Sequence, residues 1–258
     1  MATTYLERIL ERHREVAAAD RRALAPLLDA VGDTPPTRGF RGALFDRDSL
    51  GVISEIKRRS PSKGDLNTAL DPAALAAAYE RGGAACLSVL TDEEFFGGSA
   101  DDLRAARSAC ALPVLRKDFT VCEHDVVDAR LMGADCVLLI VAALDPSQLN
   151  DLHALAVEIG LDVLVEINGE HELEHALAAG STLIGVNQRD LVTFEVDHDR
   201  AERMGGIIPG SAVKVAESGV RNGDDARRLY AAGYDAVLVG ETLVTSSDPG
   251  AAISELVR

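Results

Sequence analysis

Eight short runs of apolar residues recur along the chain after about residue 45, and each has the length of a β-strand. The runs are continuous rather than alternating and are rich in β-branched residues, which is typical of strands buried on both faces of a parallel sheet. They cover residues 52–57, 86–90, 112–117, 135–141, 161–167, 182–188, 212–218 and 235–240.

The segments between these runs are rich in Ala and Leu and carry signals for the starts and ends of helices. Asp71, Ser99 and Asn222 are typical N-cap residues, and Gly83 and Gly133 come just before the next strand. Eight such strand–helix units predict an α/β fold, a single (β/α)8 TIM barrel. A doubly wound open sheet is the alternative, but it more often has fewer strands, and no G-x-G-x-x-G follows the first run.

The first 45 residues have a different pattern. The segment MATTYLERILERHREVAAADRR is amphipathic and dense in both charge signs, and a Thr-Pro-Pro-Thr-Arg-Gly linker follows at residues 34–39. We expect one or two helices here, in an N-terminal helical extension and linker of residues 1–45 that precedes a catalytic barrel of residues 46–258. The pattern leaves open whether this extension caps the bottom of the barrel or flanks its active face.

Charged residues stand at the ends of the predicted strands. Glu55 and Lys57 lie two residues apart in the first run, so they point to the same face. Such groups are costly in a buried strand unless they pair or do chemistry. Barrel active sites form where the strands end, so we expect these side chains to meet at one mouth. The candidates collected in this way are Glu55, Lys57, Lys117, Glu166, Asn187, Arg189 and Glu217.

Glycine-containing turns follow the last two predicted strands, where barrels commonly bind phosphate. They are Ser218-Gly219 and Gly240-Glu241. Glycine allows backbone N–H groups to approach an anion closely. The sequence therefore predicts a phosphate site at these turns.

The loops after the first three strands supply further candidates. Ser60 and Pro61 begin a Ser-Pro-Ser-Lys-Gly stretch that ends the first strand and adds hydroxyl groups and a cation. Phe96 and Phe119 offer aromatic walls in a chain that contains no Trp. Ordinary packing of loops on the core explains these two aromatic residues equally well.

Composition excludes several classes of protein. The net charge of −16 argues against general affinity for nucleic acid or anionic membranes. No apolar run reaches membrane-spanning length, and the N-terminus lacks the apolar core and cleavage site of a secretory signal. We expect a soluble cytoplasmic protein without nucleic-acid or membrane partners, as a monomer, with a weak homodimer as the alternative.

The four cysteines and six histidines show no metal-binding pattern. The cysteines lack C-x-x-C spacing, so we expect free thiols in a reducing compartment. His171 and His175 are four residues apart but lie among glutamates, which favours a solvated helix face. We expect no metal site.

The strand-end motifs resemble those of the indole-3-glycerol-phosphate synthase family, and the resemblance covers essentially the whole chain. Glu-x-Lys-x-x-Ser-Pro-Ser-x-Gly at residues 55–64 is a hallmark of that family. Further stretches that resemble it lie at residues 87–99, 114–119, 133–144, 163–167, 184–197 and 215–220. Gln188 departs from the pattern, because the family commonly has Asn there, and Glu241 stands where some members have Ser.

The resemblance implies a reaction of tryptophan biosynthesis that needs no cofactor. In that reaction 1-(2-carboxyphenylamino)-1-deoxyribulose 5-phosphate closes a ring, loses CO₂ and loses water to give indole-3-glycerol phosphate. By resemblance, Lys117 is the acid at the carbonyl oxygen and Glu166 is the base in dehydration, with Glu55 or Lys57 contributing. Asn187 and Glu217 complete the implied catalytic set. The implied substrate-binding set is Ser60, Pro61, Phe96, Phe119, Arg189, Ser218, Gly219, Gly240 and Glu241.

Two other readings of the residues remain. Another phosphosugar barrel, such as phosphoribosylanthranilate isomerase or the tryptophan synthase α subunit, would share the phosphate turns. It would not be expected to carry Glu55, Lys57, Lys117 and Glu166 together. A non-catalytic ligand-binding barrel would not need both Lys117 and Glu166.

Overall fold

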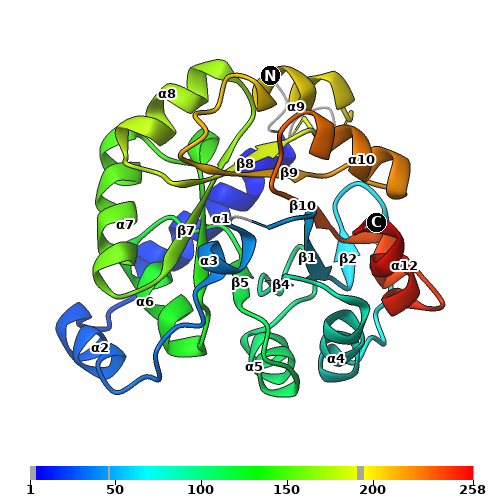
Figure 1. Cartoon of the computed structure of the whole chain (residues 1–258). Coiled ribbons are helices and arrows are strands. Elements are labelled where there is room, and N and C mark those ends of the chain that lie inside the picture. Colours follow the sequence, from blue (N-terminus) through cyan, green and yellow to red (C-terminus); the bar gives the residue numbers. More distant parts are fainter. Residues whose placement is uncertain (1–3, 46, 191–194, 258) are drawn as a thin grey trace.

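Eight parallel strands close into a barrel in which β1 pairs with both β4 and β10 (Figure 1). The computed structural model describes residues 4–45, 47–190 and 195–257. The strands of the barrel are β1 (Gly51–Ile56), β4 (Cys86–Leu90), β5 (Val114–Lys117), β6 (Cys136–Ile140), β7 (Asp162–Ile167), β8 (Leu183–Asn187), β9 (Val213–Glu217) and β10 (Ala236–Val239). Each strand falls within one residue of a predicted apolar run or inside it, so the predicted (β/α)8 barrel is confirmed.

A helix follows each strand of the barrel and packs on its outer face (Figure 1). Asp71, Ser99 and Asn222 cap the helices α4, α5 and α10 through their side-chain oxygens, as the sequence predicts. The outer helices are α4 (Pro72–Gly82), α5 (Ala100–Ala109), α6 (Glu123–Met132), α7 (Pro146–Glu158), α8 (Glu170–Ala178), α9 (His198–Gly205), α10 (Gly223–Ala231), α11 (Glu241–Val244) and α12 (Pro249–Leu256). A single 3-10 turn, η1 (Val141–Ala143), precedes α7.

The Ser-Pro-Ser-Lys-Gly stretch forms a small hairpin rather than an irregular loop. Its two antiparallel strands are β2 (Arg59–Ser60) and β3 (Gly64–Asp65). The hairpin stands directly after β1, so it projects from the end of the barrel where the strands finish.

Buried apolar residues form two layers. The outer layer lies between the strands and the helices and includes Val52, Leu87 and Val165. The inner layer fills the barrel and includes Ile53 and Leu164. Because side chains alternate along a strand, Glu55 points to the same face as Ile53, and Glu166 to the same face as Leu164. The charged residues at the strand ends therefore lie above the inner layer.

In the part of the N-terminal segment that the structure describes, three helices precede the barrel: α1 (Tyr5–Ala19), α2 (Leu24–Val31) and α3 (Phe40–Leu44). The last was not expected from the sequence, because five residues including Gly42 give no helical period. Phe40 and Leu44 of α3 are fully buried with the inner layer, next to Gly51 and Cys86 at the starts of β1 and β4.

The other two N-terminal helices lie elsewhere on the barrel. In Figure 1, α2 lies beside α6, and Arg22 in the turn before it pairs with Asp128 of α6. Helix α1 crosses the opposite end from α3, where Arg14 donates to the carbonyl of Ala143 after β6. The sequence left open whether the extension caps the bottom of the barrel or flanks its active face. The structure shows both, because α3 closes the bottom and α1 flanks the mouth.

The division into an extension of residues 1–45 and a barrel of residues 46–258 stays a prediction, and residues 1–3, 46, 191–194 and 258 lie outside the described residues. None of the described helices is long and apolar enough to cross a membrane.

Candidate active site

A cavity of about 480 Å³ opens at the C-terminal ends of the barrel strands. Every residue that the sequence proposed for the catalytic or substrate-binding set lines it, so all these strand-end groups lie at one mouth. These residues are Glu55, Lys57, Ser60, Pro61, Phe96, Lys117, Phe119, Glu166, Asn187, Arg189, Glu217, Ser218, Gly219, Gly240 and Glu241.

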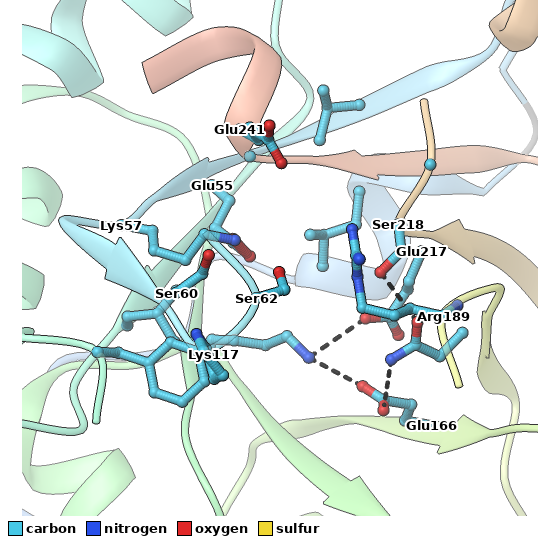
Figure 2. A pocket seen from close by; sticks show the side chains of 18 of the residues that line it. Glu55, Lys57, Ser60, Ser62, Lys117, Glu166, Arg189, Glu217, Ser218 and Glu241 are labelled. Carbon is cyan, nitrogen blue, oxygen red and sulfur yellow. Dashed lines mark hydrogen bonds and ion pairs between the residues drawn. The ribbon is translucent and has the colours of Figure 1, made fainter. Parts of the chain in front are cut away.

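Lys117 lies between two buried carboxyl groups on one side of this cavity (Figure 2). Its Nζ atom is 2.9 Å from Oε2 of Glu166 and 3.3 Å from Oε2 of Glu217. Glu166 is 1% exposed and Glu217 2% exposed, so water screens these charges little. An added Cβ at Gly185 would lie 2.1 Å from Oε1 of Glu217, so this glycine makes the space for that carboxyl group.

The three groups shift one another's pKa values in different directions. Burial disfavours the ammonium of Lys117, but Glu166 and Glu217 outweigh burial and raise its pKa above the usual value. Burial also opposes ionisation of Glu166, yet Lys117 and a hydrogen bond from Asn187 lower its pKa. Burial raises the pKa of Glu217 to about 8, and the charge of Glu166 adds to this rise while Lys117 opposes it. At neutral pH the site therefore holds one ammonium, one carboxylate and one protonated carboxyl group.

Asn187 links these carboxyl groups to the turn after β9. Its Nδ2 donates to Glu166 over 3.0 Å, and its Oδ1 accepts from the hydroxyl of Ser218 over 2.9 Å. Ser218 has a φ of 68°, in the left-handed region that residues other than glycine rarely adopt. Gln188 is 1% exposed and donates from Nε2 to the carbonyl of Ser218 over 2.7 Å, so it holds this turn in place.

A second acid–base pair lies across the cavity, where Lys57 donates to Glu55 (Figure 2). An added Cβ at Gly240 would lie 2.5 Å from Oε1 of Glu55, so the turn after β10 approaches this pair closely. Glu241 begins the short helix α11, and its carboxylate lies 3.5 Å from Nζ of Lys63 in the hairpin. The hairpin and the turn after β10 thus meet at the rim.

Aromatic residues form a wall beside Lys117. The rings of Phe96 and Phe119 are tilted against one another, with centroids 6.2 Å apart. Tyr5, Leu6 and Ile9 of α1 line the same cavity. The amphipathic pattern of the N-terminal segment indicated a helix, but nothing in it indicated which face of the barrel this helix would cover.

Some lining residues were missed by the sequence reasoning. Leu138, Ile140 and Leu238 are apolar residues inside strands, so no polar signal marked them. His198 begins α9 and Arg221 lies in the loop before α10, where the order of residues does not show which side chains point into the cavity.

One group among the described residues could supply three ligands to a metal ion, because donor atoms of His13, Asp92 and Asp118 lie within 4.8 Å of one another. Protein donors already occupy the carboxylate oxygens: Asp92 accepts from two backbone N–H groups, and Asp118 accepts from Arg116 and Thr91. We therefore interpret the group as a hydrogen-bond network. The four cysteines, two of them buried, are free thiols.

The sequence profile of the indole-3-glycerol phosphate synthase family matches residues 6–256. The chain belongs to this family. An indole-3-glycerol phosphate synthase from Leptothrix cholodnii is 48% identical over 252 residues, which are 96% of this chain and 96% of the relative. Indole-3-glycerol phosphate synthase 2 from Streptomyces coelicolor is 51% identical over 240 residues, or 92% of this chain and 93% of the relative.

Solved structures outside the family share the architecture. A thiamine phosphate pyrophosphorylase from Pyrococcus furiosus matches 80% of this chain and 93% of its own, with a TM-score of 0.61 and 17% identity. At this identity the likeness concerns the fold alone. Within the family motif at residues 184–197, residues 191–194 lie outside the described residues, while Asn187 and Arg189 before them line the cavity.

Proposed function

We propose that this protein is an indole-3-glycerol phosphate synthase, a carboxy-lyase that acts on 1-(2-carboxyphenylamino)-1-deoxyribulose 5-phosphate. The observation that carries the proposal is the position of Lys117, an ammonium group held between two buried carboxyl groups beside an aromatic wall. Family membership over residues 6–256 supports the same reaction. A carboxylated aromatic ring and a phosphate at opposite ends of one substrate match the two ends of this cavity.

In the first step, the ring carbon that bears the carboxylate attacks the ketone carbon of the substrate. Negative charge develops on the ketone oxygen, and Lys117 supplies a proton and a positive charge there. Loss of CO₂ from the same ring carbon then restores the aromatic ring. The raised pKa of Lys117 keeps it charged at neutral pH, so the acid is present before the substrate arrives.

In the second step, the new hydroxyl group leaves as water and a proton leaves the neighbouring carbon atom. Glu166 is the base in this step, since its lowered pKa keeps it a carboxylate at neutral pH. Glu55 and Lys57, which form an ion pair across the cavity, contribute to this proton transfer. Glu217 carries a proton and can donate a hydrogen bond to a substrate hydroxyl group. The two roles differ because the pKa of Glu166 is lowered while that of Glu217 is raised.

The remaining residues hold the two ends of the substrate. Ser218, Gly219 and Gly240 form the phosphate end, with Asn187 orienting substrate hydroxyl groups. Phe96 and Phe119 pack on the anthranilate ring. Lys57 and Arg189 hold the anthranilate carboxylate or the phosphate, while Ser60, Pro61 and Glu241 complete the rim.

Formation of the indole product tests this function directly. The chain contains no Trp, so indole fluorescence that develops after the substrate is added comes from the product alone. Release of CO₂ should match the product in amount. Inorganic phosphate should compete with the substrate. If neither indole nor CO₂ is formed, the protein does not have this function.

We also propose that the protein is a cytoplasmic monomer. Among the described residues, the exposed large apolar side chains belong to separate parts of the chain, as on an ordinary monomer surface, and four free thiols suit a reducing compartment. The exposed residues are Val16, Phe45, Val157, Leu177, Ile207 and Tyr230. Light scattering after gel filtration measures the mass, and a dimer mass would contradict the proposal. Cell fractionation measures the location.

A further inference from the structure

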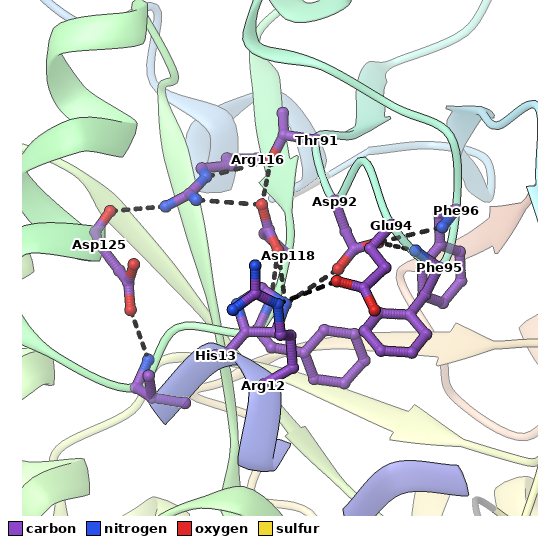
Figure 3. Close-up of polar contacts among 12 residues, drawn as sticks. Arg12, His13, Thr91, Asp92, Glu94, Phe95, Phe96, Arg116, Asp118 and Asp125 are labelled. Carbon is purple, nitrogen blue, oxygen red and sulfur yellow. Dashed lines mark hydrogen bonds and ion pairs between the residues drawn. The ribbon is translucent and has the colours of Figure 1, made fainter. Parts of the chain in front are cut away.

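His13 joins the N-terminal helix α1 to two loops at the mouth of the barrel (Figure 3). Its Nε2 atom lies 2.9 Å from Oδ2 of Asp92, in the loop after β4, and 3.8 Å from Oδ1 of Asp118, directly after β5. Each aspartate residue is only 5% exposed. A hydrogen bond to a buried carboxylate is among the stronger ones in proteins, so this contact can fix the position of α1 on the barrel.

The two aspartates also fix the aromatic wall of the cavity. Oδ1 of Asp92 accepts from the backbone N–H groups of Phe95 and Phe96, over 2.6 and 3.0 Å. Asp118 stands between Lys117 and Phe119 in the sequence, and it accepts the N–H of Phe119 over 2.9 Å. The His13 ring itself lies against Phe119, with centroids 5.5 Å apart. One side chain of α1 therefore contacts the anchors of both aromatic residues of the wall.

We propose that His13 is a positioning residue for the aromatic end of the substrate: it docks α1 on the two loops and so fixes Phe96 and Phe119. The inference rests on the proposed function, because that function places the anthranilate ring on this wall. Docking of α1 also brings Tyr5, Leu6 and Ile9 to the cavity. A displaced α1 would thus loosen the wall and open one side of the site.

The charge around His13 makes this docking sensitive to pH. Burial disfavours the protonated ring, but Asp92 and Asp118 outweigh burial, and with Asp125 of α6 they raise the pKa of His13 above its usual value. Nearby cations include Arg116, which donates to Asp118, and Arg12, which pairs with Glu94. Arg59 donates to the carbonyls of Glu93 and Glu94 in the loop of Asp92. The charged contact is complete below the usual pKa of histidine, and it is lost as pH rises through the raised pKa. The KM for the substrate should therefore rise over that interval.

Three variants of the full chain test the role of His13. His13→Ala should raise KM about tenfold to a hundredfold, as for loss of one hydrogen bond to a charged group, with kcat nearly unchanged. In His13→Gln the terminal amide can donate from the position of Nε2, so KM should stay near the wild-type value at high pH. This variant should also lose the part of the pH dependence of KM that comes from His13. Arg12→Gln is the control, since its ion pair joins the same helix to the same loop but is 49% and 59% exposed.

Binding of an analogue whose ketone is reduced to an alcohol provides a readout without turnover. Its anthranilate fluorescence reports occupancy of the wall, and His13→Ala should bind it more weakly than Arg12→Gln does. If the wild type forms no indole, the proposed function fails, while this binding difference still decides the role of His13. The positioning role is overturned if His13→Ala binds the analogue as tightly as the wild type, or if it lowers kcat and leaves KM unchanged.

Discussion

The ammonium group of Lys117 on β5 lies 2.9 Å from a carboxylate oxygen of Glu166 on β7, across the strand that separates them. The two residues are 49 positions apart in the sequence, and the pairing of β6 with both β5 and β7 brings them together. Each group keeps the other ionised in a place where burial alone would neutralise both. An acid and a base are therefore ready at neutral pH without any rearrangement.

Replacement of Lys117 by Ala should lower kcat by on the order of 10²-fold or more, because the developing oxyanion loses its proton donor and its positive charge. Lys214→Ala is the matched control. Lys214 is also a strand lysine, but its Nζ atom donates to the carbonyl of Gly205 outside the barrel, 2.7 Å away. Steady-state kinetics of the two variants should differ in kcat alone. Turnover of Lys117→Ala within a few-fold of the wild type would remove Lys117 from the mechanism.

The strands and several helix starts could be predicted because their signals are local. A buried parallel strand reads as an apolar run, and a capping residue such as Asp71 or Ser99 acts within its own helix. Helix α3 could not be predicted in this way, because Phe40 and Leu44 are helical through their burial at the bottom of the barrel. Its five residues form a helix only in that tertiary setting.

The residues of the site likewise differ in whether a local signal marks them in the sequence. Glu55, Lys117 and Glu166 stand out as charges at the ends of apolar runs, and the barrel geometry then requires that they meet. His13 gives no such signal, since it is one polar residue in a highly charged helix. Its partner Asp92 lies 79 positions away in a loop, so only the folded structure shows the contact.

Glu217 should make stability depend on pH between its ordinary pKa of 4.5 and its value of about 8 in the folded protein. Within this interval the folded protein keeps a proton that the unfolded chain has released. The contribution of protonated Glu217 to the free energy of unfolding is thus complete below pH 4.5, and it is lost as pH rises to about 8. Glu217→Gln has no such proton, so its Tm relative to the wild type should rise from pH 5 to pH 8. The rise should be about 2–4 °C for each kcal/mol that the proton contributes. Thermal unfolding followed by circular dichroism measures it, and a constant difference between the two proteins would contradict the raised pKa.

Gln188 should matter for phosphate binding although it is absent from the cavity lining. Gln188→Leu keeps the volume but removes the donor to the carbonyl of Ser218, and this should release the left-handed turn. We expect KM for the substrate and the inhibition constant of inorganic phosphate to rise together by roughly tenfold. Gln188→Asn keeps an amide group and is the control. Its KM and its inhibition constant for phosphate should lie between those of Gln188→Leu and the wild type. If phosphate inhibits Gln188→Leu as strongly as the wild type, the turn does not depend on this hydrogen bond.

Asp135 should support stability without supporting catalysis, because it lies at the bottom of the barrel. Its carboxylate is fully buried, pairs with Arg107, and accepts from the N–H groups of Arg38 and Val114, each over 2.8 Å. It thereby joins the linker before α3 to β5. Asp135→Ala leaves a guanidinium and two N–H groups without their acceptor, so the free energy of unfolding should fall by about 3–5 kcal/mol.

A matched exposed pair shows whether burial is the cause of this effect. Asp101 pairs with Arg104 over 2.9 Å, but the side chain of Asp101 is 90% exposed. Asp101→Ala should therefore change the free energy of unfolding by less than about 1 kcal/mol. Urea denaturation measures both variants, and kcat of the folded fraction of each should equal that of the wild type. Equal losses of stability in the two variants would show that the buried position of Asp135 contributes nothing beyond an ordinary ion pair.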